Sequence, residues 1–357
     1  MKYPCYNSLD ELLSPETLYQ LTGKAITPVH RTPIEGGVSG SQVLKIETTD
    51  EQPQQFVLKY MSSQTDWLMQ SSHDYACRSV TLWQYGLLDQ LQPTIDHTIL
   101  ACAYDGDNWA MLMHDVSPYL TSLEPWSEAA IKLFLDTLAT LHATFWESPE
   151  LTNSAIGLCD AAGMIKAFSI ETARQHPSET TPITKFICGG GERLQAWLDP
   201  DVADIFNALQ ANPTPLCQAL EQYSVTLLHG DYRPQNLALR PGDVPQIIAL
   251  DWQLAGRSIP TIDLAWFLAK PAILRAPVSF QVAADYYRHQ LEQRLNLRFA
   301  SKQWQAMLEL GVLVDILRIG ALRSWFAEHH KDEVYKAADQ AALKQYNDQV
   351  RAAMRWL

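Results

Sequence analysis

The first third of the chain alternates short apolar runs with polar turns. Capping patterns that begin at Ser8 and Ser14 predict two short helices before Gly23. Residues 43–46 and 56–59 are rich in β-branched and aliphatic side chains and are separated by a polar stretch, which is typical of a β-hairpin. The pattern therefore predicts a small antiparallel sheet near the N-terminus.

The periodicity becomes helical further along the chain. Residues 73–91 predict a helix, residues 109–113 a strand, and apolar side chains at helical spacing from Phe134 to Phe145 a long helix. Residues beyond 280 are expected to be helical to the end of the chain.

A chain of 357 residues is long enough for two packed units. We expect an α+β fold with a boundary near residue 114, where the composition turns polar. Residues 1–114 then form a lobe built mainly of antiparallel sheet, and residues 115–357 form a larger, mainly helical lobe.

Composition narrows the class of protein. A hydrophobic content of 47% and a charged content of 19% are those of a folded domain. The net charge of −13 and the lack of any basic run of five residues argue against nucleic acid as a partner. The acidity is also compatible with a cationic substrate, although in most acidic proteins it only favours solubility.

Cysteine spacing and hydropathy indicate the cellular location of the protein. The six cysteines include no CxxC pair, which excludes a zinc cluster or a thioredoxin motif and favours reduced thiols in the cytoplasm. The N-terminus lacks the apolar core of a secretory signal. Residues 306–326 form the most apolar long stretch but contain four charged residues, so we expect a buried helix and no membrane span.

Residues 150–222 are the least patterned segment. The Gly189–Gly191 triplet within it has no preceding strand and no following Lys-Ser/Thr, so it lacks the context of a P-loop. We interpret the triplet as a flexible loop.

The most specific segment is LLHGDYRPQNLAL, residues 227–239, in which a polar loop separates two apolar runs. Asp231 and Asn236 stand five residues apart in the loop. Phosphoryl transfer to an alcohol needs a carboxylate that accepts the hydroxyl proton and an oxygen ligand for magnesium nearby, and this spacing can supply both.

A second carboxylate follows the next predicted strand. Asp251 comes directly after the apolar run 246–250, where it can reach the same cleft and bind magnesium. Asp263 stands at the start of a predicted helix, where a carboxylate can accept hydrogen bonds from free backbone N–H groups.

The succession of HGDYRPQNL, LDWQ and DLAWFL resembles the catalytic loop, metal-binding motif and following helix of the aminoglycoside phosphotransferase and choline-kinase-like family, which includes ecdysteroid-kinase-like members. The segment LATLHATFW, residues 138–146, is also similar to a helix of that family. The resemblance implies a bilobal, protein-kinase-like fold, with Asp231 as catalytic base and Asn236 and Asp251 as magnesium ligands. His229 and Asp263 would brace the loop; for His229 alone, a structural role is favoured over proton transfer.

The first lobe carries the matching nucleotide elements. Residues 34–43 resemble the family's nucleotide-covering loop, where glycine lets backbone amides approach phosphates. Lys59 in the third predicted strand would bind the phosphates. The stretch Met113–Asp115 resembles the hinge that contacts the base through backbone groups. The expected nucleotide-binding residues are thus Gly36, Gly37, Ser39, Gly40, Ser41, Lys59, Met113, His114 and Asp115.

One position departs from the family pattern. The helix after the lysine normally offers a glutamate to pair with it, and here Ser79 stands at that place. Either Asp74 substitutes, or other groups hold Lys59, or the helix register differs from the predicted one.

The resemblance implies an ATP- or GTP-dependent kinase with magnesium as cofactor and a small hydroxyl compound as acceptor. Two alternatives remain at this point: a catalytically silent nucleotide-binding protein with the kinase fold, and a kinase acting on protein side chains. No Ala-Pro-Glu signature of a protein-kinase activation segment follows Asp251. The sequence leaves the identity of the acceptor and the oligomeric state open.

Overall fold

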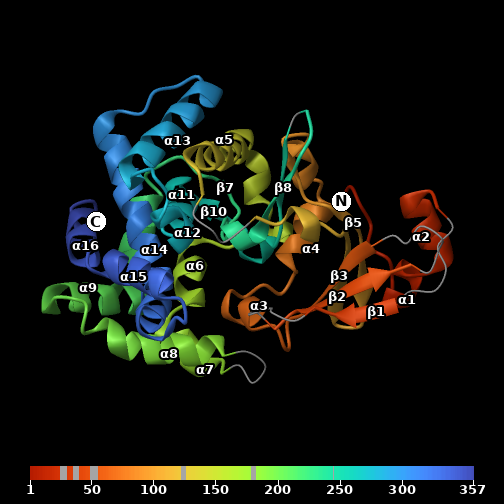
Figure 1. The fold of residues 1–357 in the computed structure, drawn as a ribbon, viewed down its shortest axis with the longest axis horizontal. Helices are drawn as coiled ribbons and strands as arrows, with labels where there is room; N and C mark the ends of the chain where they lie inside the picture. Colours follow the sequence, from red (N-terminus) through yellow and green to blue (C-terminus); the bar gives the residue numbers. More distant parts are fainter. Residues whose placement is uncertain (25–29, 35–39, 49–54, 122–125, 178–181, 244) are drawn as a thin grey trace.

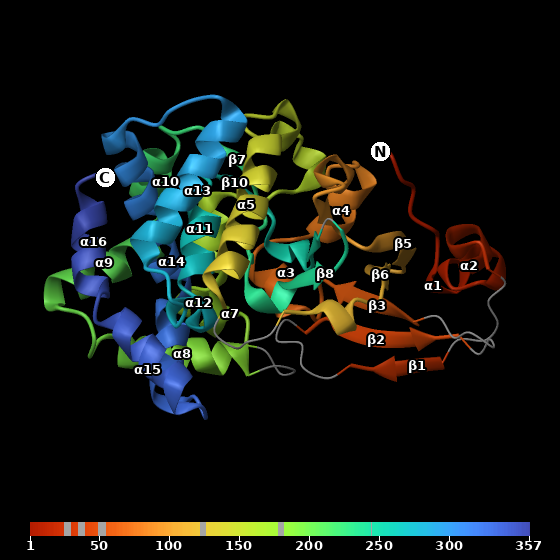
Figure 2. The ribbon, with the colours of Figure 1, turned by 45° about the horizontal axis from the view of Figure 1, so that its top comes forward.

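The computed structural model describes residues 1–357 except 25–29, 35–39, 49–54, 122–125, 178–181 and 244. A five-stranded antiparallel sheet lies at one end and a mass of helices at the other, with the N-terminus on the sheet side and the C-terminus on the helical side (Figures 1 and 2). The expected α+β, kinase-like architecture, with a sheet-containing N-terminal part and a mainly helical C-terminal part, is confirmed.

The N-terminal sheet has the order β1-β2-β3-β6-β5. Helices α1 and α2 cover one face, where Leu12 and Leu18 pack with Ile46, Leu58 and Leu112. Since side chains alternate along a strand, Lys59 and Met61 of β3 face the other side, toward α4 and the helical part. The elements of this region are α1 (Leu9–Leu12), α2 (Pro15–Thr22), β1 (His30–Pro33), β2 (Gln42–Glu47), β3 (Gln55–Ser62), α3 (Trp67–Ser71), α4 (Arg78–Gln84), β4 (Ile95–Asp96), β5 (Ile99–Asp105) and β6 (Asn108–His114).

The predicted elements here are largely confirmed. The side chains of Ser8 and Ser14 cap α1 and α2, and the hairpin is β2 paired with β3. The helix expected over residues 73–91 is shorter: α4 begins at Arg78, after Cys77 in a left-handed conformation, and a separate 3-10 turn covers residues 88–91.

The helical part is built around α14, which packs against α8, α11, α15 and α16, while α13 packs against α5. Its elements are α5 (Glu128–Thr144), α6 (Ala161–Ala167), α7 (Ile170–Gln175), α8 (Ile183–Leu194), α9 (Pro200–Ala211), α10 (Thr214–Leu220), β7 (Thr226–Leu228), β8 (Leu237–Arg240), β9 (Gln246–Ala249), β10 (Gly256–Ser258), α11 (Thr261–Leu268), α12 (Pro271–Leu274), α13 (Phe280–Leu295), α14 (Ser301–His329), α15 (Glu333–Leu343) and α16 (Tyr346–Met354). Within the described part of the chain, no helix is long and apolar enough to cross a membrane. The stretch 306–326 is instead the buried middle of α14.

The interpretation of the glycine triplet as a flexible loop is wrong. Gly189, Gly190 and Gly191 lie inside α8, the helix that packs along α14. A Cβ on Gly190 would collide with the carbonyl oxygen of Ala321 in α14. The glycines are therefore there to let two helices approach closely, which costs some helix propensity but gains backbone contact.

Two small sheets position the predicted catalytic segments. β7 pairs with β10, and β9 lies between β4 and β8. The loop 229–236 connects β7 to β8, and Asp251 follows β9, so the hairpin of β8 and β9 brings both segments to one end of the same sheet.

Candidate active site

The loop after β7 is held by a buried carboxylate from α11. The backbone N–H groups of His229 and Gly230 donate to the two oxygens of Asp263, at 2.7 and 3.0 Å. Burial works to raise the pKa of Asp263, but His142, His229 and the backbone donors outweigh it, so the pKa lies below its usual value. The expected brace from Asp263 is therefore present in the structure.

Gly230 allows the sharp turn at this point. Its φ is +78°, and a Cβ there would collide with the carbonyl oxygen of Leu254. The ring of His229 is fully buried against Trp252, and burial lowers its pKa, which favours the neutral imidazole. Its Nδ1 accepts from the backbone N–H of Asp231 at 3.3 Å, as a structural histidine should.

Asp231 is 8% exposed, and its carboxylate accepts from three side chains. Arg233 Nε lies 2.9 Å from Oδ2, Asn236 Nδ2 lies 2.7 Å from the same oxygen, and Trp266 Nε1 lies 3.0 Å from Oδ1. Two of these donors come from the loop itself, after Asp231, and the third comes from α11. They fix the carboxylate in one orientation.

Asn236 and Asp251 are brought together by a backbone contact. The N–H of Leu250 donates to the carbonyl of Asn236 at 2.8 Å, next to the pairing of β8 and β9. Because the amide nitrogen of Asn236 is directed at Asp231, its amide oxygen is turned away from that carboxylate. The two predicted metal ligands thus lie at neighbouring ends of β8 and β9, beside the predicted base.

Asp251 adopts a left-handed backbone conformation, with φ +63° and ψ +71°, which is unusual for a residue with a side chain. Its Oδ1 accepts from Lys59 Nζ at 2.9 Å. Burial pushes its pKa up, yet the charge and hydrogen bond of Lys59 bring it below the usual range. The carboxylate is therefore ionised at neutral pH, and its side chain is still 31% exposed.

Lys59 has a second partner that the sequence analysis missed. Its Nζ donates to Gln253 Oε1 at 2.8 Å, and Gln253 Nε2 donates to Asp66 Oδ2 at 3.0 Å. The hydroxyl of Ser41 also donates to Asp66. We call this set, Ser41, Asp66, Gln253 and Lys59, the lysine clamp.

The hypothesis that Asp74 replaces the family's glutamate is wrong. Asp74 is buried and accepts both of its hydrogen bonds from the backbone N–H of Arg78, at the start of α4. Ser79 is buried, and its hydroxyl has no hydrogen-bond partner in the described structure. Among the open alternatives, the structure shows the second: other groups hold Lys59. The only sequence signal was Gln253, two residues after Asp251.

The remaining nucleotide-binding predictions concern residues that precede β2 and residues at the end of β6. Gly36, Gly37 and Ser39 lie outside the described residues, while Gly40 has φ +99° and directly precedes Ser41 and β2. Met113 and His114 end β6. The N–H groups of His114 and Asp115 already donate to Thr98 and Gln55, at 3.0 and 3.3 Å, so these two donors are engaged within the protein.

Two buried cations behind Asp231 were also missed. Lys270 Nζ lies 3.2 Å from the centroid of the Trp266 ring, and the guanidinium of Arg318 lies 4.1 Å from it. Arg318 donates to the carbonyl of Gly230 at 2.7 Å. Burial lowers the pKa of Lys270 to about 7, against the opposing charges of Asp315 and Asp231. Trp266 is thus fixed between the loop 229–236 and the side chains of Lys270 and Arg318.

We next compared the chain with known protein families and curated proteins. The sequence profile of the phosphotransferase enzyme family matches residues 30–300. A search of curated proteins finds no match.

Solved structures share the fold. A Ralstonia eutropha JMP134 protein provisionally assigned as an aminoglycoside phosphotransferase is 16% identical, with a TM-score of 0.50, and the match covers 96% of this chain and 98% of that one. The microcompartment-associated aminopropanol kinase is 14% identical, with a TM-score of 0.50 and coverage of 96% and 100%. The choline kinase LicA from Streptococcus pneumoniae is 15% identical, with a TM-score of 0.49 and coverage of 95% and 99%. Since the family profile covers most of the chain, this protein belongs to the phosphotransferase enzyme family.

Proposed function

We propose that this chain transfers the γ-phosphoryl group of magnesium-bound ATP or GTP to a hydroxyl group of a small molecule. The observation that supports this most is the meeting of Asp231, Asn236 and Asp251 at one end of the β8–β9 hairpin, with Lys59 on Asp251. Membership of the phosphotransferase family supports the reaction class.

Asp231 is proposed to take the proton of the acceptor hydroxyl. Its three side-chain donors hold the carboxylate in place, so that the hydroxyl arrives at a base that is already oriented. The proton leaves the hydroxyl oxygen for a carboxylate oxygen as the new O–P bond forms and the bond to the leaving nucleoside diphosphate breaks.

The residues present fit a magnesium ion. The amide oxygen of Asn236 and the ionised, partly exposed carboxylate of Asp251 are hard oxygen donors, which magnesium prefers together with phosphate oxygens and water. When bound, the ion would neutralise charge on the phosphates. Lys59 is proposed to contact the phosphates as well, held for this by Asp251 and Gln253.

The acceptor is proposed to be a small molecule, as the names of the similar kinases suggest. The net charge of −13 argues against nucleic acid or another polyanionic surface as a binding partner. All six cysteines are free, as expected in a reducing compartment, which supports the proposed location in the cytoplasm.

The test is a transfer assay with ATP or GTP, magnesium and a panel of amino alcohols, sugars, aminoglycosides and a folded protein mixture. Mass spectrometry would identify the phosphorylated product. We expect a phosphorylated small alcohol whose formation needs magnesium. Phosphorylation of protein with no small-molecule product would assign the chain to protein kinases. Nucleotide binding with no transfer to any acceptor would favour a silent kinase-fold protein.

A further inference from the structure

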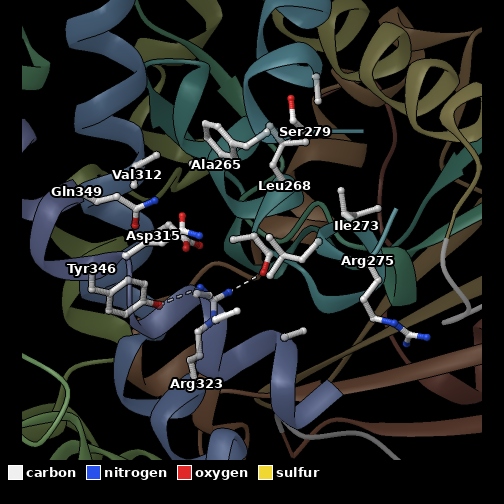
Figure 3. A pocket seen from close by; sticks show the side chains of 18 of the residues that line it. Ala265, Leu268, Ile273, Arg275, Ser279, Val312, Asp315, Arg323, Tyr346 and Gln349 are labelled. Atoms are coloured by element: carbon white, nitrogen blue, oxygen red, sulfur yellow. Dashed lines mark hydrogen bonds between the residues drawn. The ribbon is translucent and has the colours of Figure 1, made fainter. Parts of the chain in front are cut away.

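A cavity lies within the helical part, and no residue of the loop 229–236 lines it. Its volume is about 590 Å³, and it is enclosed by α11 to α16 together with Ile131 of α5. Most of its lining is aliphatic, with Leu268, Ile273, Val312 and Ala338 among the walls. Figure 3 shows Asp315, Arg323 and Tyr346 on one side of it and Leu268 and Ile273 across from them. Its size is that of a pocket for a small organic molecule.

The cavity is separated from Asp231 by α11. On this helix, Asp263 and Trp266 face the catalytic loop, because both donate to or accept from it. Ala265, Leu268 and Ala269 line the cavity instead. At about 100° per residue, Leu268 lies about 140° around the helix from Asp263 and about 160° from Trp266, whereas Ala269 is only about 60° from Trp266. No residue of the loop 229–236 lines the cavity, and neither Lys59 nor Asp251 does, so its lining is distinct from the candidate active site.

One buried carboxylate borders this otherwise apolar space. Asp315 of α14 lines the cavity, is 4% exposed, and its Oδ1 has no hydrogen-bond partner among the described residues. A buried carboxylate oxygen without a hydrogen bond is unfavourable, so Oδ1 is available as an acceptor for a ligand that enters the cavity.

The neighbouring cations do not hydrogen-bond to this carboxylate. Arg323 donates to the Tyr346 hydroxyl at 2.9 Å and the Ala269 carbonyl at 2.6 Å, and its Nε lies 3.3 Å from Asp339. Lys270 is directed at the face of Trp266, and its Nζ also has no hydrogen-bond partner in the described structure. Asp315 is thus left as an acceptor at the edge of an apolar cavity.

We propose that this cavity binds a small apolar molecule that carries a single hydrogen-bond donor, an amine or a hydroxyl, which donates to Asp315. The aliphatic walls bury the body of the molecule, and the donor satisfies the carboxylate oxygen. A carboxylate in place of the donor would repel Asp315. This site does not rest on the proposed transfer reaction.

The experiment compares octylamine, 1-octanol and octanoate, which share one alkyl chain and differ in the polar end. Binding to the full-length protein is measured by isothermal titration calorimetry and ligand-observed NMR. We expect the amine, the alcohol or both to bind, and octanoate to bind at least tenfold more weakly. Equal binding of octanoate, or no binding of any probe at millimolar concentration, would overturn the proposal.

Two variants locate the site. Ala338→Leu fills the cavity from α15 and should abolish probe binding, while Ala208→Leu adds the same groups on the exposed face of α9 and should not. Asp315→Asn should weaken octylamine at least tenfold and 1-octanol less, because the amide still accepts a hydrogen bond but has lost its charge. If Asp315→Asn does not fold, Ala338→Leu still decides; unchanged binding in Ala338→Leu would place the probes elsewhere and refute the assignment.

Discussion

The loop 229–236 and the lysine clamp are linked through Asp251 but are assembled in different ways. Asp231 takes two of its three side-chain donors, Arg233 and Asn236, from within five residues. Lys59 takes its partners from residues 192 and 194 positions away, and Gln253 is tied in turn to Asp66. A site whose partners are close in sequence can be recognised from a motif. A site whose partners are distant in sequence depends on how separate segments pack.

The sharpest test of the loop is Asp231→Asn. The amide keeps the shape but removes the proton acceptor, so we expect turnover to fall by about 10²–10⁴-fold, as is typical for loss of a general base. Nucleotide affinity should change little. Turnover with the best acceptor and calorimetric nucleotide binding are the measurements, with exposed Asp348→Asn in α16 as the matched control. Full activity in Asp231→Asn would remove the basis for the proposed function.

Asp251 links the two assemblies, since it follows the β8–β9 hairpin and accepts a hydrogen bond from Lys59. Asp251→Asn weakens a hard anionic ligand, so turnover should fall steeply at low magnesium and recover in part at high magnesium. A magnesium titration of turnover for both aspartate variants checks this. If excess magnesium instead rescues Asp231→Asn and not Asp251→Asn, the two roles are exchanged.

Breaking the lysine clamp should reduce activity less than replacing Asp231 does. Gln253→Leu removes the uncharged partner of Lys59 and leaves Asp66 without its donor from Gln253. A hydrogen bond to a charged group is worth about 1.5–3 kcal/mol, so we expect a loss of about tenfold or more in kcat/KM for the nucleotide.

A second substitution at residue 253 and one at an exposed position serve as controls. Gln253→Glu places a carboxylate beside Lys59 but also beside Asp66, and should recover less than wild-type activity because the two acids repel each other. Gln305→Leu, on an exposed turn of α14, should have no effect. Wild-type kinetics in Gln253→Leu would show that the clamp does not position Lys59.

The features that the sequence predicted correctly are those held by contacts between residues close in sequence. The hairpin β2–β3, the helix α5, the loop 229–236 and Asp251 were predicted because short-range periodicity and motif spacing determine them. The brace from Asp263 was predicted because it belongs to a consecutive motif. These features depend on residues that are close in sequence.

The parts that were missed depend on distant packing. Nothing near Lys59 in the sequence indicates Gln253, and Gly190 is understood only once Ala321 of α14 lies against it. Lys270 and Arg318 join Trp266 from two different helices. Such contacts have no local pattern, which is why the glycine triplet was predicted as a loop and why the partner of Lys59 stayed open among three alternatives.

The smallest expected effect on activity belongs to Asp74, because it caps α4 and does not contact Lys59. Asp74→Asn keeps an acceptor for the Arg78 N–H, so turnover and nucleotide affinity near pH 8 should stay within about twofold of wild type, as for changes away from a site. A large loss of nucleotide affinity would restore Asp74 as a partner of the lysine.

The effect of Asp74 should appear in stability instead. Burial raises its pKa from 3.8 to about 6, although Arg78 opposes this. An acid whose pKa is higher in the folded state binds its proton more tightly there, so its contribution to stability is present below pH 4 and is lost as the pH rises to about 6. The shift corresponds to about 3 kcal/mol. Asp74→Asn has no such group, so the difference in unfolding free energy between variant and wild type should change over this range and be constant above pH 7. Urea unfolding of both proteins from pH 4 to pH 8 measures it, and a difference that does not vary with pH would show that the Arg78 contacts keep Asp74 ionised throughout.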